Sequence, residues 1–110
     1  MPKYSNGRPE WEIVRCADGF NMSVQASVYN ICYPRDNTGP WSEVEVGFPS
    51  AYEHCLMPYA EEPDRPTETV YGYVPNKLVR SIIEVHGGLV SGEVPPMPVC
   101  QTETENSNRE

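Results

Sequence analysis

The chain has 110 residues, enough for one domain with a single modest core, and its net charge of −8 comes from 16 acidic and 8 basic residues. Such a charge disfavours direct binding to nucleic acid or to anionic lipid. The sequence has no apolar run near the roughly 18 residues that a membrane span needs, and its start lacks the apolar stretch of a secretory signal, so a cytoplasmic protein is expected.

The first half of the chain predicts two strands. Residues 1–10 are polar and are interpreted as a lead-in to a single α+β domain at residues 11–92. Alternation over residues 11–16 predicts a strand that ends at the turn Ala17-Asp18-Gly19. A second strand is predicted over residues 20–27, because apolar and polar side chains alternate there. Its inward residues are Phe20, Met22, Val24 and Ala26.

Residues 29–41 break this pattern with prolines, Asn37 and Gly39, which predicts a long irregular loop. The loop carries Arg35 near Tyr33 and Trp41. One interpretation is that its aromatic residues cover the edge of the core. The other is a lip that binds a ligand or partner, because a guanidinium beside aromatic rings suits anionic and planar groups.

A third strand is predicted over residues 42–48, with Val44, Val46 and Phe48 facing inward and Glu43 and Glu45 facing outward. Pro49 ends it. Residues 50–67 contain three prolines and are expected to add only a short extended piece near residues 55–59.

A strand at residues 69–74 leads into the one predicted helix. Val70 and Val74 are expected to face the core, and Gly72 is expected to leave room for the helix to pack closely. Pro75 suits the first helical turn, and Gly87 suits the position just past the end. The apolar stripe of this helix consists of Leu78, Val79, Ile82, Ile83 and His86.

These elements predict an α+β fold in which an antiparallel sheet of about four strands has one C-terminal helix packed on one face. Residues 93–110 are rich in proline and acidic residues and are expected to form a mobile tail. The other face of the sheet is left open, and because tyrosine is common at interfaces we interpret it as a binding surface. The alternative is that residues 28–41 or the C-terminal segment fold across it. The open face is predicted to carry Ser23, Gln25, Glu43, Glu45, Thr69, Tyr71 and Tyr73.

No motif points to a catalytic residue, a metal ligand or a cofactor. His54 and Cys55 are adjacent, and neighbours on an extended segment point to opposite sides, which disfavours a thiol–imidazole dyad. A zinc site would need scattered ligands to converge. The ligands for such a site would be Cys16, Cys32, His54, Cys55 and His86. All four cysteines, including Cys100, are expected as reduced thiols.

Residues 11–88 resemble a family of small, uncharacterised proteins encoded by bacteriophages. The resemblance rests on five stretches, DGFNMSVQAS, CYPR, VEVGFPS, VYGYVP and HGG. It carries no known active site. It implies an accessory protein in the host cytoplasm that acts on host machinery by binding, as anti-CRISPR and other anti-defence proteins do.

The resulting hypothesis is a non-enzymatic protein that binds and inhibits a host defence or nucleic-acid-handling complex, with carboxylates occupying a basic groove in place of phosphates. The residues predicted to contact the partner are Glu43, Glu45, Glu53, Glu61, Glu62, Asp64, Glu68, Tyr71 and Tyr73. The alternative is sequestration of a signalling nucleotide by Tyr33, Arg35 and Trp41. Like charges on the open face favour a monomer or a weak homodimer.

Overall fold

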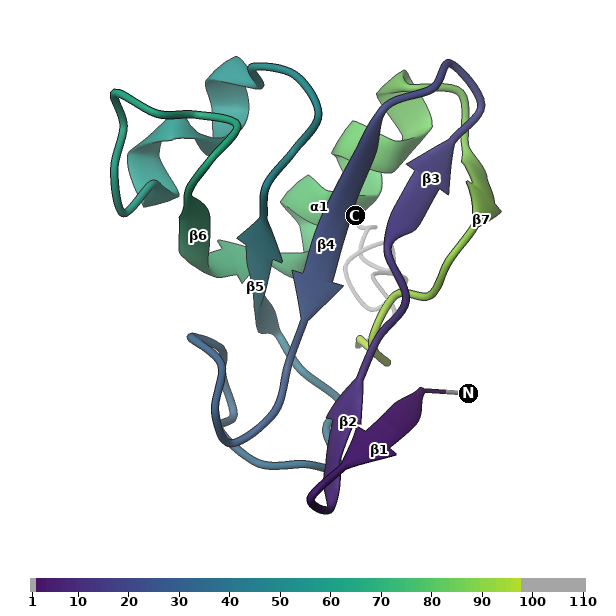
Figure 1. The fold of residues 1–110 in the computed structure, drawn as a ribbon, viewed down its shortest axis with the longest axis vertical. Helices are drawn as coiled ribbons and strands as arrows, with labels where there is room; N and C mark the ends of the chain where they lie inside the picture. The colour runs from purple at the N-terminus through teal and green to yellow at the C-terminus, as the bar shows by residue number, and fades with distance from the viewer. Residues whose placement is uncertain (1, 98–110) are drawn as a thin grey trace, which may run out of the picture.

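The computed structural model describes residues 2–97, which form an α+β fold (Figure 1). Most of the fold is β structure, and the α-helix lies near the C-terminal end. The elements are β1 (Lys3–Ser5), β2 (Arg8–Glu10), β3 (Val14–Cys16), β4 (Asn21–Gln25), β5 (Glu43–Gly47), the 3₁₀ helix η1 (His54–Tyr59), β6 (Val70–Pro75), α1 (Asn76–Val85) and β7 (Leu89–Ser91).

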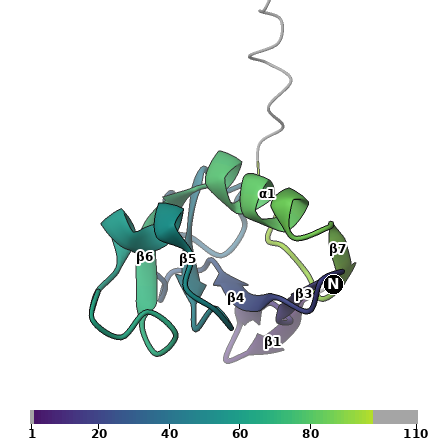
Figure 2. The ribbon, with the colours of Figure 1, turned by 90° about the horizontal axis from the view of Figure 1, so that it is seen from above.

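The central sheet has five antiparallel strands in the order β6-β5-β4-β3-β7, and β1 and β2 form a separate hairpin. Figure 2 shows α1 and η1 on one side of this sheet and the hairpin on the other. The prediction of an antiparallel sheet with a C-terminal helix on one face is confirmed. The sheet has one strand more than expected, because the chain turns back after α1 and pairs β7 with β3.

The core lies between the sheet and α1. The predicted helical stripe is confirmed, since Val79 and Ile82 are buried and Leu78 and Ile83 pack against the core. Burial of such apolar side chains is the main driving force for folding. The buried side chains are Val14, Cys16, Phe20, Met22, Val24, Ala26, Cys32, Trp41, Val44, Val46, Leu56, Tyr71, Val74, Val79 and Ile82.

A β-bulge in β6 corrects the predicted position of Tyr71. Val44 pairs with Val74 and Val46 pairs with Tyr71, so Gly72 and Tyr73 together lie opposite the single residue Glu45. The extra residue shifts the alternation by one position. Tyr71 is therefore fully buried, whereas it was predicted on the open face. Thr69 is also buried rather than on that face, Val70 is half-buried, and Tyr73 is exposed with a φ of 53°.

The end of β5 corrects a second prediction. Phe48 was expected to continue the inward row of Val44 and Val46, but its side chain is 57% exposed. Its φ is 50°, in the left-handed region, which turns the side chain out of the strand alternation. Pro49, one residue later, is buried instead.

Residues 2–10, within the expected lead-in, contain the β1–β2 hairpin. Its turn is Asn6-Gly7, with φ values of 54° and 82°, the combination that a two-residue type I′ turn requires. The Asn-Gly pair is a strong sequence signal for a hairpin, and the interpretation as a lead-in overlooked it. The hairpin lies at one end of the sheet (Figure 1), and its residues Arg8 and Glu10 line a pocket together with Ser23 and Gln25 of β4.

Residues 93–97, the first part of the expected tail, contact the domain. Val94 and Met97 pack against the core, and the backbone carbonyl of Pro96 accepts a hydrogen bond from the Trp41 N–H at 2.9 Å. The rest of the predicted tail, residues 98–110 with Cys100, lies outside the described residues. Within residues 2–97, no helix has the length and apolar character to cross a membrane.

Candidate functional site

The loop after β4 covers part of the sheet face opposite α1. A carboxylate oxygen of Glu45 accepts hydrogen bonds from the Ile31 N–H at 2.9 Å and from the Asn30 side chain at 3.3 Å. Ile31 also lies over Gly72, where an added Cβ would be 2.6 Å from Ile31 Cγ2. Gly72 therefore makes room for this loop, whereas we expected it to make room for the helix. Of the two predicted alternatives for the open face, partial coverage by residues 28–41 is the one observed.

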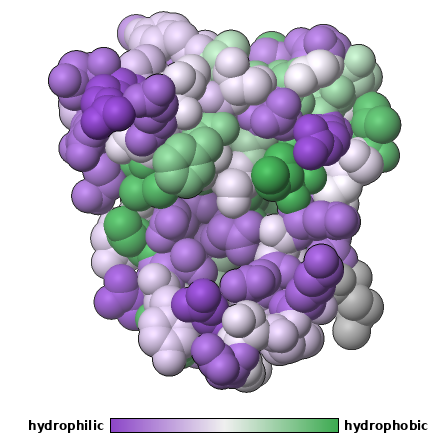
Figure 3. All heavy atoms as spheres, in the orientation of Figure 1, coloured by the Kyte–Doolittle hydropathy of each residue, from purple (hydrophilic) through white to green (hydrophobic). Residues whose placement is uncertain are grey.

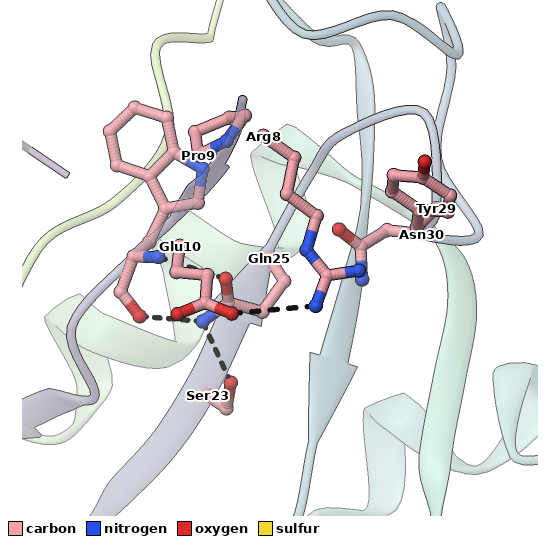
Figure 4. A pocket seen from close by; sticks show the side chains of 8 residues that line it. Arg8, Pro9, Glu10, Ser23, Gln25, Tyr29 and Asn30 are labelled. Atoms are coloured by element: carbon pink, nitrogen blue, oxygen red, sulfur yellow. Dashed lines mark hydrogen bonds and ion pairs between the residues drawn. The ribbon is translucent and has the colours of Figure 1, made fainter. Parts of the chain in front are cut away.

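A pocket of about 340 Å³ remains on this face between the hairpin and the loop (Figure 4). Its size is at the lower limit for small-molecule sites. Most of its polar groups already bond to one another. The Gln25 side chain accepts from the Trp11 N–H at 2.9 Å and donates to the Trp11 carbonyl at 2.6 Å and to Ser23 at 3.1 Å. These bonds join the hairpin to the sheet. The lining residues are Arg8, Pro9, Glu10, Trp11, Ser23, Gln25, Tyr29 and Asn30.

The charged groups of this pocket also pair with each other. The Arg8 guanidinium lies 5.0 Å from the centre of the Tyr29 ring and 3.4 Å from the Glu10 carboxylate. The two opposite charges leave the pocket without a net charge to attract an anion. Ser23, Glu43 and Gln25 are half-buried, and Figure 3 shows a mainly hydrophilic lower part of this face with hydrophobic patches across its middle.

The residues predicted for the nucleotide alternative do not share one surface. Trp41 is 1% exposed and packs edge-on against Trp11 with ring centres 6.1 Å apart, so it belongs to the core. Of the two interpretations of this loop, the one in which aromatic residues cover the edge of the core describes Trp41. Its backbone N–H donates to the Pro96 carbonyl at 2.9 Å, and a Cβ on Gly39 would be 2.5 Å from its ring. Tyr33 and Arg35 are exposed, and Arg35 Nε donates to the Asn30 carbonyl at 3.1 Å.

Four of the predicted acidic residues lie together in the loop between η1 and β6. Glu61, Glu62, Asp64 and Glu68 are all exposed. Within this loop their cationic neighbour is Arg65, whose guanidinium is 2.6 Å from Glu68 and 3.7 Å from Glu62. Surface ion pairs of this kind contribute little to stability. The loop thus presents more negative charge than its own arginine balances.

The core anchors the acidic loop and places aromatic side chains beside it. The buried Tyr71 hydroxyl donates to the Pro66 carbonyl at 2.5 Å, and the Phe48 N–H donates to the Thr69 carbonyl at 3.0 Å. Burial, and to a lesser extent the charge of Tyr52, raise the pKa of Tyr71. Phe48 and Tyr52 are 57% and 55% exposed. The term "acidic end" denotes Phe48, Tyr52, Glu61, Glu62, Asp64 and Glu68.

The predicted residue Glu53 lies in a separate cluster with His86. His86 is the C-cap residue of α1, and its ring has Nδ1 2.6 Å from an Asp18 oxygen and Nε2 2.7 Å from a Glu53 oxygen. The ring also stacks on Phe20, with centres 4.0 Å apart. A hydrogen bond with Asp18, and a weaker one with Glu53, raise the pKa of His86 despite the opposing effect of burial. His86 therefore packs at the helix end, where the predicted apolar stripe places it.

His54 and Cys55 lie at the start of η1, and the His54 ring contacts the Tyr52 hydroxyl at 3.2 Å. Burial and the Glu53 carboxylate raise the pKa of the Cys55 thiol, the reverse of what an activated nucleophile needs. Cys16, Cys32 and Cys55 are free thiols. In the described part of the chain, no three His, Cys, Asp or Glu side chains are arranged to hold a metal ion.

The chain was compared with protein-family models, curated proteins and solved structures, and none of the three comparisons found a match. The site is therefore interpreted from its own geometry.

Proposed function

We propose that this protein is a non-catalytic binding module whose acidic end contacts a basic surface of a protein or ribonucleoprotein partner. The observation that carries the proposal is the exposed loop with Glu61, Glu62, Asp64 and Glu68, together with the exposed rings of Phe48 and Tyr52. Thr69 links Phe48 to this loop, because its carbonyl accepts from the Phe48 N–H and its hydroxyl accepts from the Glu62 N–H, both at 3.0 Å. Carboxylates steer a basic partner, and aromatic side chains supply contact area at the centre of an interface.

The electrostatics of the whole chain support the same proposal. A net charge of −8 attracts a basic groove over a distance comparable to the Debye length, about 10 Å at 0.1 M salt. Among the predicted site residues, those outside the acidic end form no comparable group of exposed carboxylates. Glu43 and Glu45 are half-buried, and Glu53 is bound to His86. We therefore assign the contact to the acidic end rather than to the open face.

The resemblance to phage proteins suggests the kind of partner. In this proposal the carboxylates of the acidic end occupy a phosphate-binding groove of a host defence or nucleic-acid-handling complex and inhibit it. The nucleotide alternative is weaker, because Trp41 lies in the core and cannot stack on a base. No second function is proposed.

The test is a pull-down from lysate of the phage host with the tagged protein at about 50 mM and about 500 mM salt, between which exposed charges become strongly screened. The variant is Glu61→Gln, Glu62→Gln and Asp64→Asn together. We expect the captured partner to be depleted at high salt and by this variant.

The matched control is Glu10→Gln, Glu12→Gln and Glu84→Gln, which changes the net charge equally at exposed positions outside the acidic end. It should retain most of the capture. Equal loss in both triple variants would indicate an effect of net charge alone. Capture indifferent to salt and to both variants would reject the acidic end as the contact.

A further inference from the structure

His86 connects three segments that are distant in the sequence. Asp18 belongs to the turn between β3 and β4, Glu53 precedes η1, and His86 ends α1. The side chains of His86 and Glu53 are only 16% and 18% exposed, whereas that of Asp18 is 50% exposed. The groups that face the ring are therefore two carboxylates and the apolar face of Phe20. The nearby thiols Cys16 and Cys55 stay protonated, because burial raises the pKa of each.

The two short contacts cannot both be hydrogen bonds when the ring is neutral. A neutral imidazole has one N–H donor and one lone pair, whereas an ionised carboxylate is only an acceptor. With both ring nitrogens within 2.7 Å of carboxylate oxygens, only the imidazolium donates to both. We propose that protonation of His86 closes a clamp that holds Glu53, and with it the neighbouring Tyr52 of the acidic end, against the end of α1.

The geometry points to the Glu53 contact as the one that opens when the proton leaves. The Asp18 carboxylate is fixed by a second bond, because its other oxygen accepts from the Phe20 N–H at 2.9 Å. The Asp18 N–H in turn donates to the His86 carbonyl at 3.1 Å. A neutral ring therefore keeps its proton on Nδ1, toward Asp18. Its Nε2 then presents a lone pair to the Glu53 carboxylate, and the two repel each other.

The clamp regulates the surface assigned above, so this inference rests on the proposed function. Phe48 and Ser50 are held by other bonds, since the Phe48 N–H donates to the Thr69 carbonyl at 3.0 Å and Ser50 exchanges two bonds with Asn21, at 2.8 and 3.0 Å. The Glu53–His86 contact is the one that ties residues 51–53 to the helix end. Its release leaves Tyr52 to be ordered when a partner binds. Because ordering such side chains costs affinity, we expect about fivefold to tenfold weaker binding above the pKa of His86.

The sign of the pH dependence follows from the raised pKa of His86 in the folded chain. The clamp contributes stability that is fully present below the unfolded pKa, about 6.5 for histidine. That stability is lost as the pH rises through the folded pKa, which lies higher. The clamp is therefore closed in mildly acid solution and opens as the pH rises through this raised pKa.

The test is a pH titration of the free protein by NMR, following the His86 ring and the backbone amides of residues 50–53. We expect the amides to shift with the same midpoint as the ring, while the Asp18 turn keeps its contact. In Glu53→Gln the amide group can donate to a neutral ring or accept from a charged one, so residues 50–53 should stay attached at every pH. Its His86 midpoint should also fall. Glu12→Gln is the matched control and should behave like the wild type.

The clamp would be overturned if the amide shifts of residues 50–53 did not change at the His86 midpoint. It would also be overturned if residues 50–53 detached in Glu53→Gln as in the wild type. A shift confined to the Asp18 turn would overturn it too. The free-protein titration needs no partner, so it stands even if the acidic end binds nothing. Partner affinity measured below and above the His86 midpoint tests whether the clamp regulates binding. If the clamp opens with pH but the affinity does not change, the clamp exists and its regulation of binding is rejected.

Discussion

The two faces of the central sheet are covered in different ways. On one face, α1 and η1 bury a continuous apolar set that includes Val46, Leu56 and Ile82. On the other, the hairpin and the loop after β4 are held by single polar side chains, Gln25 on Trp11 and Glu45 on Ile31, each joining residues 14 apart. Apolar burial is non-directional and cumulative, whereas a single hydrogen bond contributes only about 1 kcal/mol, or about 1.5–3 kcal/mol when it involves a carboxylate, and depends on its geometry. We therefore expect mutations on the helix-covered face to reduce the free energy of unfolding more than mutations on the opposite face.

The largest expected effect is on the helix-covered face. Ile82→Ala removes a side chain that is 2% exposed and leaves a cavity in the core, so we expect a loss of about 2–5 kcal/mol in the free energy of unfolding. Chemical denaturation followed by circular dichroism measures it. Val85→Ala, on the same helix but 80% exposed, is the control and should change stability by about 0.5 kcal/mol or less. Equal losses in the two variants would contradict the assigned packing of α1.

A smaller effect is expected where the loop crosses the sheet. Gly72→Ala places a Cβ 2.6 Å from Ile31 Cγ2, and relief of this overlap should cost about 1–3 kcal/mol. Gly47→Ala meets only ordinary contacts, 3.6 Å to Val70 and 3.7 Å to Ser23, and should be nearly neutral. Adding Ile31→Ala to Gly72→Ala should remove the overlap, so a double-mutant cycle should show coupling. Strict additivity would mean that Ile31 does not lie over Gly72.

The smallest effect is expected at the hairpin. Gln25→Ala removes both bonds to the Trp11 backbone, but water can replace them at this half-buried position, so the global loss should be about 1 kcal/mol. The clearer readout is local, since the amides of β1 and β2 should exchange hydrogen faster than those of β4 and β5. Ser23→Ala removes one acceptor but leaves the Trp11 bonds and is the control. Unchanged exchange in the hairpin of Gln25→Ala would show that other contacts hold it.

The helix-covered face could be predicted from the sequence because its apolar residues recur with the period of a strand or a helix. Alternating residues such as Met22 and Val24, and the helical stripe with Val79 and Ile82, report burial directly. The predictions failed where backbone conformation interrupts a period. Tyr73 and Phe48 both adopt positive φ without being glycine, and neither position carries a residue that signals this.

For the candidate site, the sequence indicated the acidic residues but not how they and the aromatic residues are arranged in space. The carboxylates of residues 61–68 were identified correctly as exposed, because proline and charge mark a surface loop. Phe48 and Tyr52 were not predicted beside them, since their exposure depends on how β5 ends. The contact of Glu53 with His86 spans 33 residues, and no local pattern encodes a pair at that separation.

The bulge in β6 also constrains how this chain can gain or lose residues. Deleting either Gly72 or Tyr73 would restore regular pairing with β5, and Tyr71 and Val74 would still face the core because they would stand two positions apart. Deleting both residues would instead make Tyr71 the neighbour of Val74 and turn Tyr71 and every preceding residue of the strand to the opposite face. The bulge therefore lets this edge strand lose one residue, but not two, without exchanging its inside and its outside. Homologous chains are expected to differ by at most one residue in the spacing from Tyr71 to Val74.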